Sequence, residues 1–295
     1  MPVVATEPRI NAKQNLLYSH NACTPGWKHR LGLRSVNRPV FEGAWNCSPT
    51  CLLPRITSAI KREAGDGCGV SRQYQHRLPL GLLLLQQGTI TQEELQIVLQ
   101  AQRTAGHGRF GDWLRIILHM DESTIARSLA RQWSCPIFGI TDLQPARMAL
   151  LAPAQLLHAS EAVPLRISLE GRIHLAFRES LDASLAIAIE RMAGIRLDKG
   201  LAMAHDFEEA RERIEEADAI PVTEHRVDNT PALEDILVRS IMHSQPVASR
   251  FVRVHSTFWL RMWLEEATLN NGIAGPPHSP IDIQDVLIHF DPPAQ

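Results

Sequence analysis

The sequence has 295 residues, a formal net charge of -2 and 44% hydrophobic residues. This length is typical of about two domains, and the hydrophobic fraction is sufficient for ordinary cores. The near-neutral charge excludes a general attraction to polyanions, and no apolar run approaches the roughly 20 residues that span a bilayer. We therefore expect a soluble globular protein of the cytoplasm, without a membrane span.

The first segment, residues 1–75, is rich in Pro, Gly and Asn and contains four of the five cysteines. We expect an irregular module with one helix around residues 53–63. Its Lys and Arg residues outnumber its Asp and Glu residues, whereas the rest of the chain is acidic. Such an excess is consistent with a nucleic-acid or partner surface, or simply with a solvated face, and the sequence leaves both open.

The cysteines of this segment form a possible metal-binding pattern. His20 and Cys23 make one pair, and Cys47 and Cys51 make a second pair after a loop. Two pairs of soft ligands suit tetrahedral zinc, which would stabilise a segment with little core. The stretch WNCSPTCL also resembles the second half of small zinc-ribbon modules. Reduced, unligated thiols and participation of Cys68 remain alternatives.

Residues 76–144 contain two copies of one pattern, separated by thirty residues. Leu80-Gly81 opens the first copy and Phe110-Gly111 opens the second. Thr91 and Glu94 predict a capping box in the first copy, and Asp121 takes the place of Thr91 in the second. Each copy is therefore expected to form a short helix, a tight turn and a second helix whose apolar stripes pair with those of the other copy.

Residues 145–217 alternate between strand and helix patterns. VPLRISLEGRIHLAF predicts two strands with a turn at Glu170-Gly171, and SLDASLAIAIERMAG predicts a helix that ends at Gly194. IRLDKGLAMA predicts a further strand, and DFEEARERIEEA predicts a polar helix. We expect a small α/β sandwich here.

Residues 218–295 begin with a linker rich in Pro, Asp and Asn, followed by an expected helix over residues 231–243. FVRVHSTFWLRMWL alternates apolar residues at period two and predicts a hairpin that turns near His255-Ser256-Thr257. DVLIHF predicts one more short strand. The expected fold class is α+β: a tandem helical repeat, a small α/β sandwich, an irregular cysteine-containing N-terminal module, and a C-terminal helix plus hairpin.

No pattern of a catalytic site stands out. The sequence lacks the phosphate-binding pattern G-x4-G-K-[ST], the nucleophile pattern G-x-S-x-G and the zinc-protease pattern H-E-x-x-H. The glutamates of residues 208–216 alternate with arginines on one helix, which indicates a solvated face. We do not expect an enzyme.

The tandem copies resemble the MshEN domain, the N-terminal region of type II secretion and type IV pilus assembly ATPases. The shared features are an opening Leu-Gly or Phe-Gly, a turn glycine, and an apolar-x3-apolar-x2-Gln ending. SCPIF and VPLRISLEGRIHLAFRESLD resemble the α/β subdomain that follows in that family, so the resemblance covers residues 76–217. The first copy has Pro79 where the family has Arg, and the second has Leu118 where the turn glycine stands.

The resemblance implies that the two copies jointly bind cyclic di-GMP, one half of the dinucleotide to each. The implied ligand-binding residues of both copies are Leu80, Gly81, Leu84, Gly88, Leu95, Leu99, Gln102, Arg109, Phe110, Gly111, Leu114, Ile125, Leu129 and Gln132. A glycine at a helix start leaves backbone N–H groups open to an anion, and Arg109 can pair with phosphate or stack on a base.

Three functions remain open at this point. The first is a non-catalytic cyclic di-GMP receptor or adaptor for a protein partner of secretion, pilus or exopolysaccharide machinery. The second keeps the fold without the ligand, as an interaction scaffold that docks on secretion machinery. The third, the least favoured, is nucleic-acid binding through the basic first segment.

Overall fold

The computed structural model describes residues 17–18, 39–69, 77–269 and 274–291. His20 and Cys23 lie outside these ranges. The fold is α+β, as expected, with three small sheets among the described residues. Contacts between the described residues divide the chain into two compact units, one within the ranges 1–64, 221–275 and 281–295, and the other within 65–220 and 276–280.

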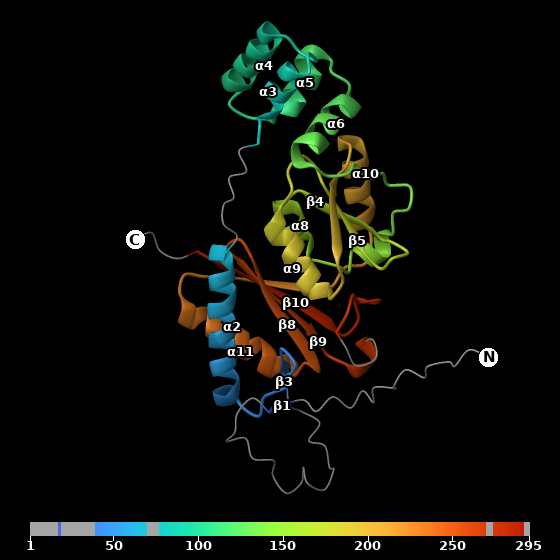
Figure 1. Ribbon diagram of the computed structural model, residues 1–295. Coiled ribbons are helices and arrows are strands. Elements are labelled where there is room, and N and C mark those ends of the chain that lie inside the picture. The colour runs from blue at the N-terminus through green and yellow to red at the C-terminus, as the bar shows by residue number, and fades with distance from the viewer. Residues whose placement is uncertain (1–16, 19–38, 70–76, 270–273, 292–295) are drawn as a thin grey trace, which may run out of the picture. The chain divides into compact units, whose positions relative to one another are not determined.

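The first unit combines segments from both ends of the chain (Figure 1). Its helices and strands are β1 (Leu17–Tyr18), β2 (Val40–Phe41), β3 (Ala44–Trp45), α2 (Pro49–Gly69), β7 (Val222–Val227), α11 (Thr230–Ser244), β8 (Ala248–Val254), β9 (Thr257–Trp263), η1 (Glu266–Thr268) and β10 (Ile283–Phe290). Helix α2 is thus longer than the helix expected around residues 53–63.

A four-stranded sheet with the order β7-β10-β9-β8 forms the centre of this unit. The predicted hairpin is β8 and β9, which are antiparallel, and DVLIHF belongs to β10, which is antiparallel to β9. Phe258, Leu260 and Met262 of β9 pack in one apolar core with side chains from α2 and α11. The helix of the first segment therefore shares a core with the C-terminal helix and sheet.

The second unit contains the tandem motifs and the α/β layer (Figure 1). Its helices and strands are α3 (Leu80–Gln86), α4 (Gln92–Ala105), α5 (Phe110–Leu118), α6 (Glu122–Trp133), α7 (Pro145–Met148), α8 (Ala154–Ala159), β4 (Ala162–Ile167), β5 (Ile173–Phe177), α9 (Ala183–Ala193), β6 (Leu197–Leu201) and α10 (Ala204–Glu215).

The α/β layer has a three-stranded sheet with the order β4-β5-β6. Strands β4 and β5 are antiparallel and turn at Gly171, whose φ of 73° favours glycine; β5 and β6 are parallel, joined through α9. Helix α9 ends at Gly194 in the left-handed conformation, as the sequence predicts. No described helix has the length and hydropathy needed to cross a membrane.

Candidate functional site

The two motif glycines are buried at corresponding places. A Cβ added to Gly81 would lie 2.6 Å from Cδ1 of Leu95, and one added to Gly111 would lie 3.4 Å from Cγ2 of Ile125. Leu95 and Ile125 occupy the same position in the two copies. The absence of a side chain at Gly81 therefore lets the first helix of its motif approach the second closely. At Gly111 the contact with Ile125 is an ordinary one, and the nearest atom is instead Oε1 of Glu179, at 3.1 Å.

The two motif glutamines make a reciprocal pair of hydrogen bonds. Gln102 Nε2 donates to the carbonyl of Gly108 at 3.0 Å, just before the second motif, and Gln132 Nε2 donates to the carbonyl of Leu78 at 2.7 Å, just before the first. Leu78 and Gly108 are again thirty residues apart. Each glutamine thus fixes the start of the other copy, and the copies form an internally symmetric pair.

Most other residues of the predicted site belong to the core of this pair. Leu84, Leu95, Leu114, Ile125 and Leu129 are buried, with exposed fractions of 9% or less. Leu80, Leu99 and Phe110 are partly buried, and Gly88 is exposed at its turn with a φ of 67°. These apolar side chains account for how the motifs pack, independently of any ligand.

The turn of the second motif differs from that of the first. Helix α5 continues through Leu118, and the left-handed residue is His119, with a φ of 50°. Thr91 and Glu94 form the predicted capping box, whereas the side chain of Asp121 caps no backbone N–H group of α6 and instead hydrogen-bonds the hydroxyl of Ser123. The second copy therefore accommodates the loss of its turn glycine by moving the turn one residue along the chain.

The starts of the two motifs lie next to each other. The Cβ position of Gly81 is 3.0 Å from Cζ of Phe110, which opens the second motif directly after Arg109. The first motif has no corresponding arginine at Pro79. Arg77 lies with its guanidinium 3.5 Å from the centroid of the Trp133 ring, a cation–π contact.

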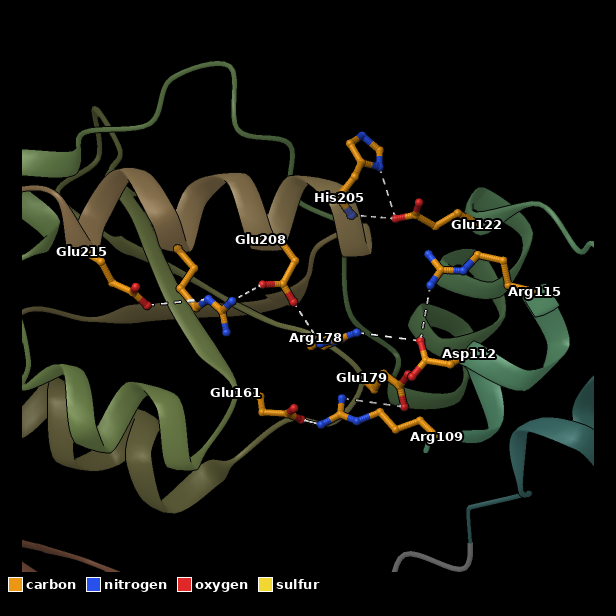
Figure 2. A network of polar contacts seen from close by, with 11 residues as sticks. Arg109, Asp112, Arg115, Glu122, Glu161, Arg178, Glu179, His205, Glu208 and Glu215 are labelled. Carbon is orange, nitrogen blue, oxygen red and sulfur yellow. Dashed lines mark hydrogen bonds and ion pairs between the residues drawn. The ribbon is translucent and has the colours of Figure 1, made fainter. Parts of the chain in front are cut away.

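Arg109 faces the α/β layer. Its guanidinium forms an ion pair with Glu161, and Nη1 lies 3.9 Å from Oε2 of Glu179. Glu161 immediately precedes β4 and Glu179 follows β5 by two residues, and the antiparallel register pairs Ala162 with Phe177. The sheet register thus brings both carboxylates to the edge that meets Arg109 (Figure 2).

Glu179 also contacts the start of α5. Its Oε1 atom would lie 3.1 Å from a Cβ added to Gly111. Burial raises the pKa of Glu179, while the positive charge of Arg109 lowers it and the negative charge of Asp112 raises it further. A carboxylate in this position is therefore costly to keep ionised, and Arg109 compensates part of that cost.

Further charged pairs join the second motif to the α/β layer (Figure 2). Arg178 Nη2 lies 3.7 Å from Oδ1 of Asp112 on α5, and Arg178 Nη1 lies 2.9 Å from Oε1 of Glu208 on α10. Glu122 of α6 accepts hydrogen bonds from the backbone N–H and the ring Nδ1 of His205 at 3.0 and 3.2 Å. The second motif is thus attached to the α/β layer by several partly exposed charge pairs.

A cavity of about 40 Å³ lies among these groups. Its lining includes the motif residues Gly111, Ile125 and Leu129 together with Arg115, Arg178 and Glu179. This volume is room for a few water molecules. A dinucleotide at this place would therefore require the surrounding charge pairs to separate.

The predicted zinc ligands fall partly within the described residues. Cys47 and Cys51 lie at the start of α2 with their Sγ atoms 3.1 Å apart. No group of three or more His, Cys, Asp or Glu side chains suited to a metal occurs among the residues that the structure describes. His20 and Cys23 are outside those residues, so the four-ligand set stays a prediction.

Sequence reasoning did not identify Glu161, Arg178 or Glu179 as part of the site. They follow or precede strands as ordinary charged residues, and they lie some fifty to seventy residues after Arg109 in the sequence. The only available signal was their place at strand ends, which is common for charged residues. Their role depends on the register of β4 and β5 and on how the α/β layer meets α5.

Comparisons with known proteins give structural likenesses alone. No protein-family model and no curated protein matches the sequence. A structure of MshE with cdg is similar with a TM-score of 0.39 and 22% identity, covering 47% of this chain and 99% of that one. A structure of the N-terminal domain of XpsE has a TM-score of 0.35 and 19% identity, covering 48% of this chain and 96% of that one. A second XpsE structure gives 0.27 and 19%, covering 44% and 90%.

Proposed function

We propose that the chain is a non-catalytic, cytoplasmic receptor or adaptor that binds cyclic di-GMP through its two helical motifs. Its protein partner would belong to secretion, pilus or exopolysaccharide machinery. The observation that carries the proposal is the adjacency of the two motif starts, with Gly81 against Phe110 and Arg109 directly before it. A single ligand with two equivalent halves can reach both motifs only in such an arrangement.

Chemistry at the second motif supports the proposal. The side chain of Arg109 lies at the start of the second motif and is 30% exposed. A guanidinium can bind a phosphate through two parallel hydrogen bonds or stack on a guanine base. The first motif, which has Pro79 instead of arginine, would contribute apolar contacts and backbone groups only.

Calorimetric titration of the full chain with cyclic di-GMP tests the proposal. We expect heat of binding for the wild type and a loss of about ten- to a hundredfold in affinity for Arg109→Ala, because a charge-assisted contact disappears. Arg127→Ala is the matched control: this arginine lies in the same motif and hydrogen-bonds Ser123 of its own helix. Absence of heat for the wild type at high micromolar ligand would reject the receptor.

A specific observation favours a second candidate, the ligand-free interaction scaffold. Arg109, Gln102 and Gln132 all have partners within the chain, so each has a structural role without a ligand. Under this alternative the α/β layer would dock on a secretion component and the titration would show no heat. A structural zinc held by His20, Cys23, Cys47 and Cys51 is compatible with either function, and the zinc content of the purified protein decides it.

A further inference from the structure

The groups of the second motif that suit an anion already face negative charges of the same chain. Arg109 pairs with Glu161 and lies near Glu179, and Glu179 also contacts the start of α5 at Gly111. Carboxylates and phosphates bind a guanidinium in the same two-pronged geometry. The two glutamates therefore occupy the place that an anionic ligand of Arg109 would take.

This arrangement is confined to one copy of the repeat. At the corresponding place of the first copy, the atoms nearest to a Cβ on Gly81 belong to the apolar side chains of Leu95 and Phe110. The second copy has Ile125 in the place of Leu95, but Glu179 in the place of the aromatic ring. The copy that retains the arginine is thus the copy that meets the carboxylates.

The carboxylates are held in position by the sheet. The backbone N–H of Arg178 donates to the carbonyl of Glu161 at 3.1 Å, which joins the start of β4 to the end of β5. The side chain of Arg178 is in turn fixed by Glu208 at 2.9 Å. Glu161 and Glu179 therefore lie on an edge whose two strands are hydrogen-bonded to each other, and their contact with Arg109 connects the second motif to the α/β layer.

We propose that Glu161 and Glu179 are an internal substitute for the ligand's phosphate, which must displace them from Arg109 in order to bind. This proposal rests on the function proposed above and adds its regulation. Displacement would break the Arg109 link between the second motif and the edge of β4 and β5. Ligand binding would thereby change how firmly the two parts of this unit are held together, which is a way to report the ligand to a partner.

The proposal predicts a gain of affinity from removing negative charge. An internal competitor lowers the apparent affinity for the ligand, because only molecules in which Arg109 is free can bind it. Removing the competitor restores the full affinity. We expect Glu161→Gln/Glu179→Gln to bind cyclic di-GMP about tenfold more tightly than the wild type, with each single variant in between. Glutamine keeps the size of the side chain while losing the charge.

The experiment is a calorimetric titration of the full chain with cyclic di-GMP for the wild type, both single variants and the double variant. Glu215→Gln is the matched control, since it removes a glutamate of the same unit that pairs with His158 and Arg211 rather than Arg109. Circular dichroism and a thermal melt verify that each variant folds. If the double variant does not fold, Glu161→Gln alone decides, because this side chain is 38% exposed and the substitution keeps its size.

The possible outcomes separate this inference from the function on which it rests. Binding by the wild type with equal or weaker binding by the double variant would overturn the inference and leave the receptor intact. Binding by the double variant alone would support both, with a strong internal competitor. Absence of binding in every variant would overturn the receptor and this inference with it.

Discussion

At the scale of single residues, the recurring glutamines illustrate how one pattern allows two explanations. Gln102 and Gln132 stand at the same place in the two copies, which by resemblance implies contact with a ligand. In the structure each side-chain amide instead satisfies a backbone carbonyl of the other copy. A repeated residue can thus be kept by the symmetry of the repeat itself, because each copy needs the same bond to the other.

The structural role of these glutamines is measurable. We expect Gln102→Ala and Gln132→Ala each to lower the free energy of unfolding by about 0.5–1.5 kcal/mol, since each removes one hydrogen bond to a backbone carbonyl. Urea denaturation of the full chain measures this loss. Gln96→Ala on the exposed side of α4 is the control and should change stability little. Unchanged stability together with lost ligand affinity would instead assign the glutamines to the ligand.

At the scale of elements, Glu122 connects two helices. It lies in the first turn of α6 and accepts the backbone N–H of His205 in the first turn of α10. Met203, the N-cap residue of α10, provides no side-chain cap, so Glu122 supplies from another helix the acceptor that this helix end lacks. The His205 ring also hydrogen-bonds Glu122, and this contact raises the pKa of His205. Desolvation opposes the shift, and the negative charge of Asp206 adds to it.

This contact predicts a pH dependence. Because the pKa of His205 is higher in the folded chain than its ordinary value of 6.5, its stabilisation is complete below pH 6.5 and disappears as the pH rises through the folded pKa. We expect Glu122→Gln to lower the His205 pKa in an NMR titration of the ring. Asp121→Asn removes a neighbouring carboxylate that contacts Ser123, and it should leave the His205 pKa nearly unchanged. An unaltered His205 pKa in Glu122→Gln would contradict the assignment.

The elements that the sequence predicts are those with local signals. The capping box at Thr91, the glycine stop of α9 and the hairpin of β8 and β9 are each signalled by residues close together in the sequence, and all three are confirmed. The expected alternation does not extend to burial in β9, all of whose residues are buried. Strand β7 lies where the sequence predicts a linker. Four of its six residues are polar, only Val227 is buried, and it pairs with β10 some sixty residues later, so neither hydrophobicity nor a local turn reveals it.

The candidate site divides in the same way. The glycines, leucines and glutamines of the motifs could be located from their thirty-residue repeat, since the repeat is visible in the sequence. The helical spacing of the leucines also predicts that they pack against the other copy, and they are buried. The glutamate partners of Arg109 could not be predicted, because they depend on the register of β4 and β5, which brings together residues that are far apart in the chain.

At the scale of the whole molecule, the sequence predicts four consecutive segments, whereas contacts join the described residues of the stretch 1–64 with those of 221–275 and 281–295 in one unit. Hydrophobic periodicity describes only contiguous stretches, so it does not reveal that α2 and α11 share a core. Phe41, Leu52, Ile56 and Ile60 are nearly inaccessible in that core, next to Leu233 and Leu237 of α11. Burial of each large side chain typically contributes about 1.5–3 kcal/mol.

These side chains determine which fragments of the chain can fold. We expect a fragment of residues 77–220 to melt cooperatively by circular dichroism, because it keeps the cores of the motifs and of the α/β layer. A fragment of residues 218–295 should remain unfolded, since losing the four side chains of the first segment removes several kcal/mol, as much as the whole net stability of a small domain. Adding a peptide of residues 39–69 should restore the structure of this fragment. The same peptide with Ile56→Ala should restore it poorly, because Ile56 is buried in the shared core. The peptide with Leu53→Ala is the control and should restore it normally, because Leu53 lies on the same helix but is 41% exposed. Cooperative melting of residues 218–295 alone would contradict this expectation, because the sheet and α11 would then need no partner from the first segment.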